Sequence, residues 1–329
     1  MTFARREVCL GLGSAVLLGG CRSLALGGRG QGEGEGEGEV LLFAYFSTGK
    51  GEGDGLKLAA SEDGFTFRTL RGGRPVLVPS VGEKKLLRDP FVWRGQGWDA
   101  PWHAVWTTAW EGVTIGHATT RDFVTWSEQR ALPVMASVAG TRNCWAPEAI
   151  FDPATGRTVL FWSSTVAGRF TETAGTSENG YNHRLWCTTT SDFERFEAPR
   201  VLYDPGFSVI DGTFAQAGDG TLWLVVKDET LTPARKWLRA CPAKGPLGPF
   251  GALGEPFSPG WVEGPMTARR GNDLTCYYDV YRDGRWGAAT TRDMVHWEDE
   301  SERLVLPAGA RHGSLLRISR AQLEAIELG

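Results

Sequence analysis

The sequence predicts an all-β fold, a five-bladed β-propeller, from two observations: a turn-like heptapeptide recurs along the chain, and short β-type runs fill the intervals between its copies. Each copy reads Ser or Thr, any residue, Asp, three further residues, then Phe or Trp. The hydroxyl and the carboxylate can accept backbone N–H bonds in a tight turn, while the closing aromatic residue enters the next strand and packs. The copies are SEDGFTF from Ser61, TRDFVTW from Thr120, TSDFERF from Thr190 and TRDMVHW from Thr291.

The spacing of these turns sets the number of units. Their Asp residues lie 59, 70 and 101 positions apart, and the last interval holds a degenerate turn, GPLGPF from Gly245, which makes five units. A β-sandwich could share the strand content but needs no regular unit. One propeller domain is therefore the better interpretation.

Runs rich in β-branched, aromatic and other apolar residues predict the strands of each unit. In chain order these runs are 41–47, 56–61, 102–109, 113–120, 158–164, 183–190, 221–227, 274–281 and 285–290. The 44 glycines favour many tight turns between short strands, and long helices are not indicated.

Five further stretches place a polar side chain where an expected strand begins. They are RDPFVW from Arg88, WAPEAIFD from Trp145, IDGTFAQ from Ile210, WVEGPMTARR from Trp261 and RHGSLLRI from Arg311. Their polar residues are separated by 59, 63, 52 and 49 positions, which matches the unit length, and they are Asp89, Glu148, Asp211, Glu263 and His312. If these positions are equivalent on the innermost strands, all five groups converge on one end of the central channel.

Four carboxylates at one channel mouth repel one another and resist desolvation, a cost that structural turns need not incur. Such a cluster suits hydrolysis of a glycosidic bond, which needs a protonated acid for the leaving oxygen and an ionised base for water. A third carboxylate close to the acid is expected to raise the pKa of the acid by like-charge repulsion.

Taken together, the five stretches resemble glycoside hydrolase family 43, inverting enzymes on a five-bladed propeller, and the resemblance covers Val40 to the C-terminus. It implies that Asp89 is the general base, that Asp211 tunes and orients the acid, and that Glu263 is the general acid. It also implies that Trp145 borders the subsite for the terminal sugar and that Arg311 binds a sugar hydroxyl or water.

The resemblance extends to further residues of the site. Arg88 and Glu148 are counted as additional substrate-binding residues, although the family fixes no chemical role for Glu148. His312 is expected in the central channel, where family members often hold a water or a metal ion such as calcium. No cofactor is expected for the chemistry itself.

Two features depart from the common family pattern. About 49 residues, Val40 to Arg88, precede Asp89, and they are expected to supply outer strands that close the last blade. IDG also replaces the more frequent IDP at Asp211. Both departures leave the subgroup open, and with it the substrate.

The resemblance implies an exo-acting glycosidase that releases terminal L-arabinofuranose, with xylose or galactofuranose as alternatives, from plant-type polysaccharide or its oligomers. Three other interpretations remain: a noncatalytic carbohydrate-binding propeller, a structural or protein-interaction propeller, and a related five-bladed hydrolase or phosphorylase acting on fructosides or mannosides. The formal charge of −4 and a pI near 5.8 provide no electrostatic footprint for a nucleic-acid partner.

The N-terminus has the pattern of an export signal. Residues 1–21 combine Arg5 and Arg6 with a short apolar run and end in LGGC, which predicts a lipoprotein-type cleavage site with a diacylglycerol on Cys21 and favours the twin-arginine route. Residues 22–39 are rich in Gly and Glu and predict a flexible tether, followed by the propeller at 40–329. The expected location is periplasmic or cell-surface, with membrane contact through the lipid alone.

Four cysteines remain after the signal segment: Cys144, Cys187, Cys241 and Cys276. They lack the CxxC spacing of a zinc site. One or two disulfides and buried free thiols are the two interpretations that the sequence leaves open.

Overall fold

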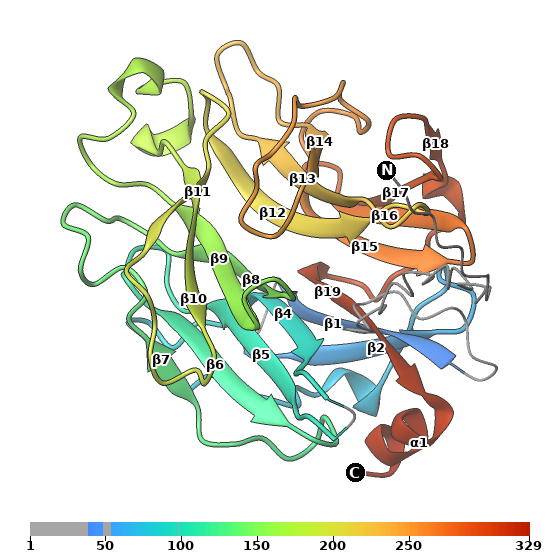
Figure 1. Ribbon diagram of the computed structural model, residues 1–329. Coiled ribbons are helices and arrows are strands. Elements are labelled where there is room, and N and C mark those ends of the chain that lie inside the picture. Colours follow the sequence, from blue (N-terminus) through green and yellow to red (C-terminus); the bar gives the residue numbers. More distant parts are fainter. Residues whose placement is uncertain (1–38, 49–53, 98) are drawn as a thin grey trace, which may run out of the picture.

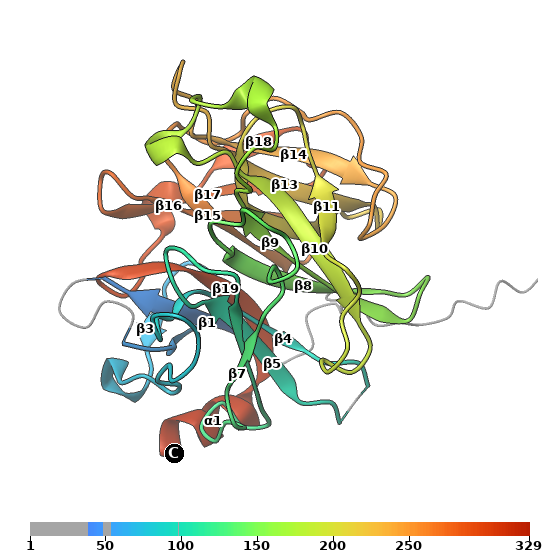
Figure 2. The ribbon, with the colours of Figure 1, turned by 90° about the vertical axis from the view of Figure 1, so that its left-hand side faces the viewer.

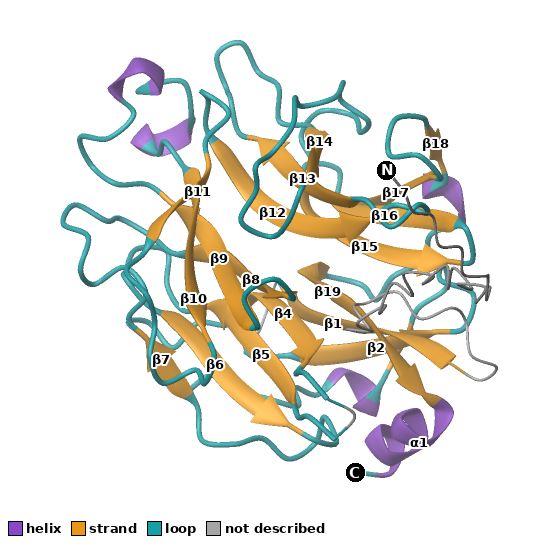
Figure 3. Ribbon diagram, in the orientation of Figure 1, coloured by secondary structure: helices purple, strands orange, loops and turns teal. Residues whose placement is uncertain are grey.

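Five antiparallel sheets surround a common centre in the computed structural model, which describes residues 39–48, 54–97 and 99–329 (Figure 1). The sheets are the five blades of a β-propeller, as the sequence predicts. Strands form most of the regular structure (Figure 3). All nine predicted runs and all five stretches with polar starts overlap strands.

Each blade begins with an inner strand at the hub and continues outward to the edge of the molecule. Blade 1 contains β19 (Ala310–Ser319), β1 (Glu39–Ser47), β2 (Lys57–Ser61) and β3 (Arg68–Thr69). Blade 2 contains β4 (Arg88–Arg94), β5 (Trp102–Thr107), β6 (Ile115–Thr120) and β7 (Arg130–Leu132). Blade 3 contains β8 (Trp145–Asp152), β9 (Arg157–Ser164), β10 (Arg184–Thr190) and β11 (Arg200–Tyr203). Blade 4 contains β12 (Val209–Gln216), β13 (Leu222–Asp228) and β14 (Leu238–Ala243). Blade 5 contains β15 (Glu263–Arg270), β16 (Asp273–Val280), β17 (Arg285–Thr291) and β18 (Trp297–Asp299).

Helices are few among the described residues. The short 3-10 helices are η1 (Arg71–Gly73), η2 (Thr171–Thr173), η3 (Glu178–Gly180) and η4 (Ser301–Arg303). The α-helix α1 (Arg320–Leu328) follows β19 and begins with a capping box, in which Ser319 and Gln322 satisfy each other's backbone N–H groups. It lies at the edge of the molecule in both ribbon views (Figures 1 and 2).

Blade 1 is built from both ends of the domain. The innermost strand β19 pairs with β1 from Glu39↔Ser319 to Ser47↔Ala310, and β1 pairs in turn with β2. The residues before Asp89 therefore supply the three outer strands of the blade that the C-terminal strand completes. This confirms the expectation for the segment Val40 to Arg88.

The repeated heptapeptides form the turns between the third and fourth strands of four blades. In blade 2, the Thr120 hydroxyl accepts the N–H of Phe123 at 2.9 Å, and the Asp122 carboxylate accepts the N–H groups of Val124 and Thr125 at 2.9 and 2.7 Å. The same bonds recur around Asp63, Asp192 and Asp293. We call these four turns the outer turns.

Blade 4 differs at its outer edge, where the degenerate turn stands. Its fourth strand is reduced to one antiparallel bridge between Ala243 and Phe250, the residue that ends GPLGPF. Two prolines that cannot donate to a ladder, one of them Pro249, limit pairing at this edge. The unit is nevertheless present, so the fifth blade falls where the sequence places it.

Large apolar side chains fill the space between blades. Trp106, Trp162 and Trp186 are fully buried, and each belongs to a cluster that joins residues of neighbouring blades. These three tryptophans therefore pack neighbouring blades against each other. The four cysteines named above are buried free thiols, so the structure shows no disulfide between them.

The expected signal segment and most of the tether, residues 1–38, lie outside the described residues. Within the part of the chain that the structure does describe, no helix has the length and apolar character needed to span a membrane.

Candidate active site

The five stretches with polar starts form the innermost strands β4, β8, β12, β15 and β19. Each of these strands contacts the next one around the centre, and β19 contacts β4, so the ring of inner strands is closed (Figure 1). We call the five polar side chains predicted from the sequence, Asp89, Glu148, Asp211, Glu263 and His312, the inner ring. Their convergence on the hub follows from this topology.

The inner ring does not occupy equivalent positions, contrary to the sequence interpretation. Each inner strand contains a bulge, and in blades 2 and 4 the bulged residue is Asp89 or Asp211, with φ of 50° and 51°. Glu263 precedes its bulge and Glu148 follows its own. A bulge turns the strand locally, so different sequence positions can aim at one place.

Positive φ at Asp89 and Asp211 is a sparsely populated backbone conformation for a non-glycine residue. Such a residue costs about 1–3 kcal/mol and persists only where the surrounding structure holds it. The two aspartates of the inner ring are therefore placed by strained backbone, as is common for active-site residues.

Asp89 is held by a hydroxyl and an imidazole. The Thr107 hydroxyl donates to its Oδ2 at 2.9 Å, and His312 Nδ1 lies 3.4 Å from its Oδ1. Burial raises the pKa of Asp89, but His312, Arg88 and Thr107 outweigh burial, so the pKa lies below its ordinary value. Asp89 is ionised at neutral pH, as a general base must be.

His312 carries a positive charge. Burial lowers the pKa of His312, but the carboxylates of Asp89, Asp211 and Glu148 outweigh burial and raise it to about 9. The ring packs against Gly264, where a Cβ atom would come within 2.5 Å of it, and Gly264 also has a φ of +59°. The glycine after Glu263 is thus needed for His312 to sit beside Asp89.

Asp211 contacts the backbone directly after the expected acid, Glu263. Its Oδ2 accepts the N–H of Gly264 at 3.0 Å, and its own N–H donates to the Ser163 hydroxyl. Burial, with the charges of Glu263 and Asp89, raises the pKa of Asp211 to about 6. The Gly212 that replaces the usual proline has a packing reason, because a Cβ atom there would meet Leu185 at 2.5 Å.

Glu263 touches two cations that the sequence interpretation did not place beside it. Lys227 Nζ lies 3.3 Å from Oε2, and Arg311 Nη2 donates to Oε1 at 2.9 Å. Burial raises the pKa of Glu263, but Lys227 and Arg311 outweigh burial and lower it below the ordinary value. The expected upward shift is wrong in direction, because the two cations act more strongly than the neighbouring carboxylates.

Glu148 is the most secluded carboxyl of the inner ring, with 5% exposure. Burial and the Asp211 charge raise its pKa to about 8, against the effects of His312 and Thr213, so it is protonated at neutral pH. The neutral carboxyl of Glu148 is therefore buried inside the inner ring, next to His312 and Asp211. Binding of a sugar by Glu148 stays a prediction.

Aromatic side chains stand beside the inner ring. Trp145 packs edge-on to Trp110 and donates its indole N–H to the Trp110 carbonyl at 2.9 Å. Trp110 is 54% exposed, and the guanidinium of Arg88 lies between its ring and that of Phe46, 4.5 Å from each. This group offers an apolar platform of the kind on which a sugar face can stack.

Three functional candidates escaped the sequence interpretation. Lys227 contacts Glu263 directly, and Asp279 is connected to it through Arg311. His183 packs against both Trp145 and Tyr181, and both of its ring nitrogens are buried and unpartnered by any described residue. Lys227 ends an otherwise apolar strand run, which is the one signal that could have drawn notice. Asp279 lies within β16 and His183 directly precedes β10, and neither belongs to a motif.

The donor set around His312 does not form a complete metal site. Among the residues that the structure describes, no three His, Cys, Asp or Glu side chains come together in a way that could hold a metal ion. His312 Nδ1 faces Asp89, and the raised pKa of the imidazole means that both nitrogens carry protons. No catalytic step is therefore assigned to a metal; an ion at His312 stays a prediction.

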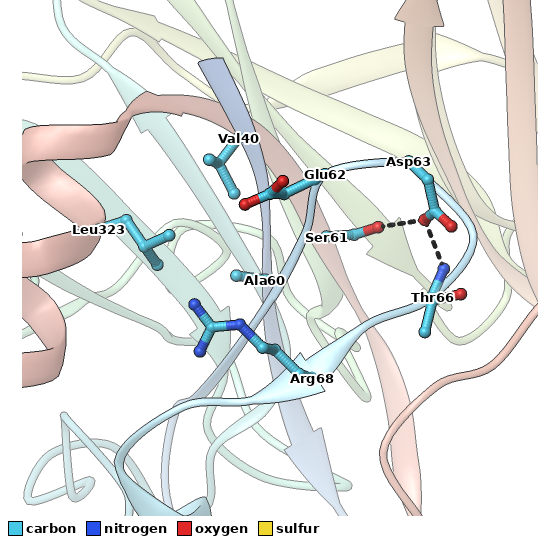
Figure 4. Close-up of a pocket in the computed structure, with 8 residues that line it drawn as sticks. All are labelled: Val40, Ala60, Ser61, Glu62, Asp63, Thr66, Arg68 and Leu323. Carbon is cyan, nitrogen blue, oxygen red and sulfur yellow. Dashed lines mark hydrogen bonds between the residues drawn. The ribbon is translucent and has the colours of Figure 1, made fainter. Parts of the chain in front are cut away.

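A cavity of about 300 Å³ lies elsewhere, beside β1, β2 and α1 (Figure 4). Its lining contains none of the predicted site residues. Its polar groups already have partners: Asp63 accepts the backbone N–H groups of its own turn, Glu62 pairs with Arg320, and Arg68 pairs with Glu327. It offers no unpaired group for chemistry.

Comparisons with known proteins agree with this architecture. A family model described as "Probable glycosyl hydrolase domain", related to glycosyl hydrolase family 43, matches residues 39–324. The comparison with curated proteins found no match.

Three solved structures illustrate the shared fold. A thermostable family-43 glycoside hydrolase has a TM-score of 0.54 at 18% identity, covering 70% of this chain and 79% of that one. A GH43_1 enzyme from Xanthomonas citri complexed with xylotriose has a TM-score of 0.53 at 13% identity, covering 68% and 76%. An α-L-arabinofuranosidase from Lactobacillus brevis has a TM-score of 0.50 at 14% identity, covering 65% and 72%. At these identities the likeness shows the fold.

Proposed function

The chain belongs to the glycosyl hydrolase family related to family 43, and from this premise we propose that it is an exported, inverting exo-glycosidase that releases terminal L-arabinofuranose from plant-type polysaccharides or oligosaccharides. The observation that carries the proposal is the convergence of Asp89, Asp211 and Glu263 at the hub of the propeller. Their charges act on one another, and their neighbours separate their pKa values.

In the proposed reaction, Asp89 accepts a proton from a water molecule, and the water oxygen attacks the anomeric carbon on the face opposite the leaving group. The bond from the anomeric carbon to the glycosidic oxygen breaks, and Glu263 donates its proton to that oxygen. Asp211 orients the acid by holding the backbone N–H of Gly264. The product sugar has the opposite anomeric configuration.

Glu263 must carry a proton when the glycosidic bond breaks. Because Lys227 and Arg311 lower its pKa, the protonated fraction in the free enzyme falls as pH rises through the acidic range. The pH profile of kcat/KM is therefore expected to be bell-shaped, with its alkaline limb below neutral pH.

The substrate proposal is tested by a hydrolysis screen with aryl arabinofuranoside, xyloside and galactofuranoside at acidic pH. Arabinofuranoside is expected to be hydrolysed fastest, and NMR of the anomer released first is expected to show inversion. Retention of configuration would contradict the single displacement. If the folded protein hydrolyses none of the three glycosides, the proposed substrate class is wrong.

A β-xylosidase is the second candidate, since one of the structures with a similar fold is complexed with xylotriose. The same screen separates the two, because each predicts a different best substrate. A noncatalytic carbohydrate-binding propeller is disfavoured, because such a protein has no need to keep a base, an acid and a tuning carboxylate together.

Export and a lipid anchor on Cys21 complete the proposal. They rest on the sequence pattern of residues 1–21, which predicts a diacylglyceryl thioether on the mature N-terminal cysteine. Expression of the full chain with a labelled fatty acid tests this point. Label in the parent and none in Cys21→Ser supports the anchor, whereas equal labelling of both would refute it.

A further inference from the structure

A row of alternating charges runs through the candidate site and has Glu263 at its centre. On one side, Lys227 Nζ lies 3.3 Å from Glu263 and 3.0 Å from Glu229. On the other side, Arg311 lies 2.9 Å from both Glu263 and Asp279. Each oxygen of Glu263 thus faces one cation, and each cation is fixed by a second carboxylate.

Lys227 is an unusual component of this row because it is 2% exposed. A buried ammonium group is costly unless it is paired. Its two carboxylate partners and the ring of Tyr281, 4.9 Å away, provide that pairing. Glu229 is held in turn by Lys236, which is also buried. Apolar residues would fill this space at lower cost, so packing does not explain the lysine.

Several other groups face Glu263 and set its charge. They are Arg311 and His312 from β19, Asp89 from β4, Asp211 from β12, Asp279 from β16 and Tyr281 directly after β16. The carboxylates oppose ionisation of Glu263, and the cations favour it. Among the cations, Lys227 lowers the pKa of Glu263 the most, ahead of Arg311.

We propose that Lys227, fixed in place by Glu229, is a positioning residue that keeps Glu263 ionised in the free enzyme and stabilises the carboxylate that Glu263 becomes after it gives its proton to the leaving group. This inference rests on the proposed role of Glu263 as proton donor. Its consequence is an enzyme restricted to acidic pH by a residue that makes no contact with the reacting bond.

The first test is the pH profile of kcat/KM. Lys227→Met is expected to move the alkaline limb upward by about one to two pH units, because an opposite charge at this distance lowers a carboxyl pKa by about 1–3. Lys227→Arg is expected to keep the limb within about half a pH unit of the parent, since it keeps the charge. The matched control is Lys244→Met, an exposed lysine of the same blade that follows β14 at the opposite end of β13. It should leave the profile unchanged.

Two further variants guard against folding and pairing artefacts. Lys227→Met/Glu229→Gln removes the charges of both residues together, so Glu229 is not left as a carboxylate without Lys227, and the limb should shift upward as it does in Lys227→Met. Glu229→Gln alone should not shift it upward. A Lys227→Met profile that superimposes on the parent, or a double variant that returns to the parent profile, would overturn the proposal.

A measurement without substrate separates this inference from the proposed function. In protein labelled with ¹³C at the Glu side-chain carboxyl, the Glu263 signal is identified by its loss in Glu263→Gln and then titrated. It is expected to titrate below the ordinary Glu range in the parent and higher in Lys227→Met. Equal titration in both overturns the role of Lys227 even if the enzyme is active. The expected shift in a protein that hydrolyses no glycoside would instead leave Lys227 in place and reject the proposed function.

Discussion

The outer turns and the inner ring each place a carboxylate in four of the five blades, yet the environments of these carboxylates are opposite. In an outer turn, Asp122 is satisfied by the N–H groups of its own next residues, and these bonds lower its pKa against a burial effect that raises it. In the inner ring, Asp211 gains its partner from another blade, and burial raises its pKa to about 6. In this comparison, a repeated carboxylate stabilises a turn where its hydrogen-bond partners are close in sequence. It belongs to the candidate active site where its partner comes from another blade.

The largest expected effect tests the inner ring. Asp89→Asn and Glu263→Gln should each reduce kcat by about 10³-fold or more, because each removes a proton-transfer group, worth roughly 10²–10⁴ in rate, from the reaction. Each variant should still fold, since neither change alters side-chain volume, although each removes the charge partner of a buried cation and should lower the melting temperature. Steady-state kinetics measures kcat and calorimetry measures the melting temperature, and Asp122→Asn is the matched control for both. Full activity in either variant would contradict the proposed role of the substituted residue.

Acid stability tests whether burial alone shifts a pKa away from the inner ring. His103 and His117 face each other at 3.1 Å between blades 2 and 3, and burial lowers their pKa values to about 4 and about 3. Unfolded histidine titrates near 6.5, so between that pH and about 4 the unfolded state binds more protons. Stability should be greatest above pH 6.5 and fall on acidification by about 1.4 kcal/mol per pH unit for each histidine.

Urea unfolding of the parent and of His103→Phe at several pH values measures this slope. The variant should lose part of the dependence in this pH window, because His117 and His183, whose pKa values burial also lowers to about 3, keep theirs. An unchanged slope would show that other groups dominate acid unfolding.

The outer turns should respond in the opposite way from the inner ring. Asp122→Ala removes an acceptor for two backbone N–H groups, and the loss of a comparable helix-capping carboxylate costs about 1–2 kcal/mol. Urea unfolding should show this loss, while kcat and KM of the folded enzyme stay within about twofold. A large fall in kcat without a loss of stability would contradict the structural role of Asp122.

The smallest effect sharpens the description of the base. Thr107→Val removes the hydroxyl that donates to Asp89 and that accepts the N–H of Ala146. Since that hydrogen bond helps to keep the pKa of Asp89 low, the acidic limb of kcat/KM should move upward by about half a pH unit. An acidic limb that stays in place would mean that His312 and Arg88 keep the pKa of Asp89 low without Thr107.

The sequence predicted what is repeated and local. The outer turns, the five units and the strand runs follow from periodicity, because each turn makes its own hydrogen bonds. The start of β15 at Glu263 could be predicted too, since Gly264 and Pro265 mark a break after a carboxylate. These features need no knowledge of distant contacts.

What the sequence could not provide depends on how blades face one another. In the sequence Lys227 is only the end of a strand in blade 4, and the packing of blade 4 against blade 5 brings it to Glu263. The sign of the pKa shift at Glu263 was missed for that reason. The bulges likewise have no periodic signal, so the unequal positions of Glu148 and Glu263 could not be predicted.

The pairing of β19 with β1 makes the candidate site depend on closure of the propeller. Arg311 and His312 both lie on β19, so Glu263 and Asp89 meet these partners only when the two ends of the domain pair. A chain truncated before Ala310 would keep every carboxylate of the inner ring and neither of these two cations. The charge balance around Glu263 and Asp89 is therefore set only when β19 closes the ring of inner strands.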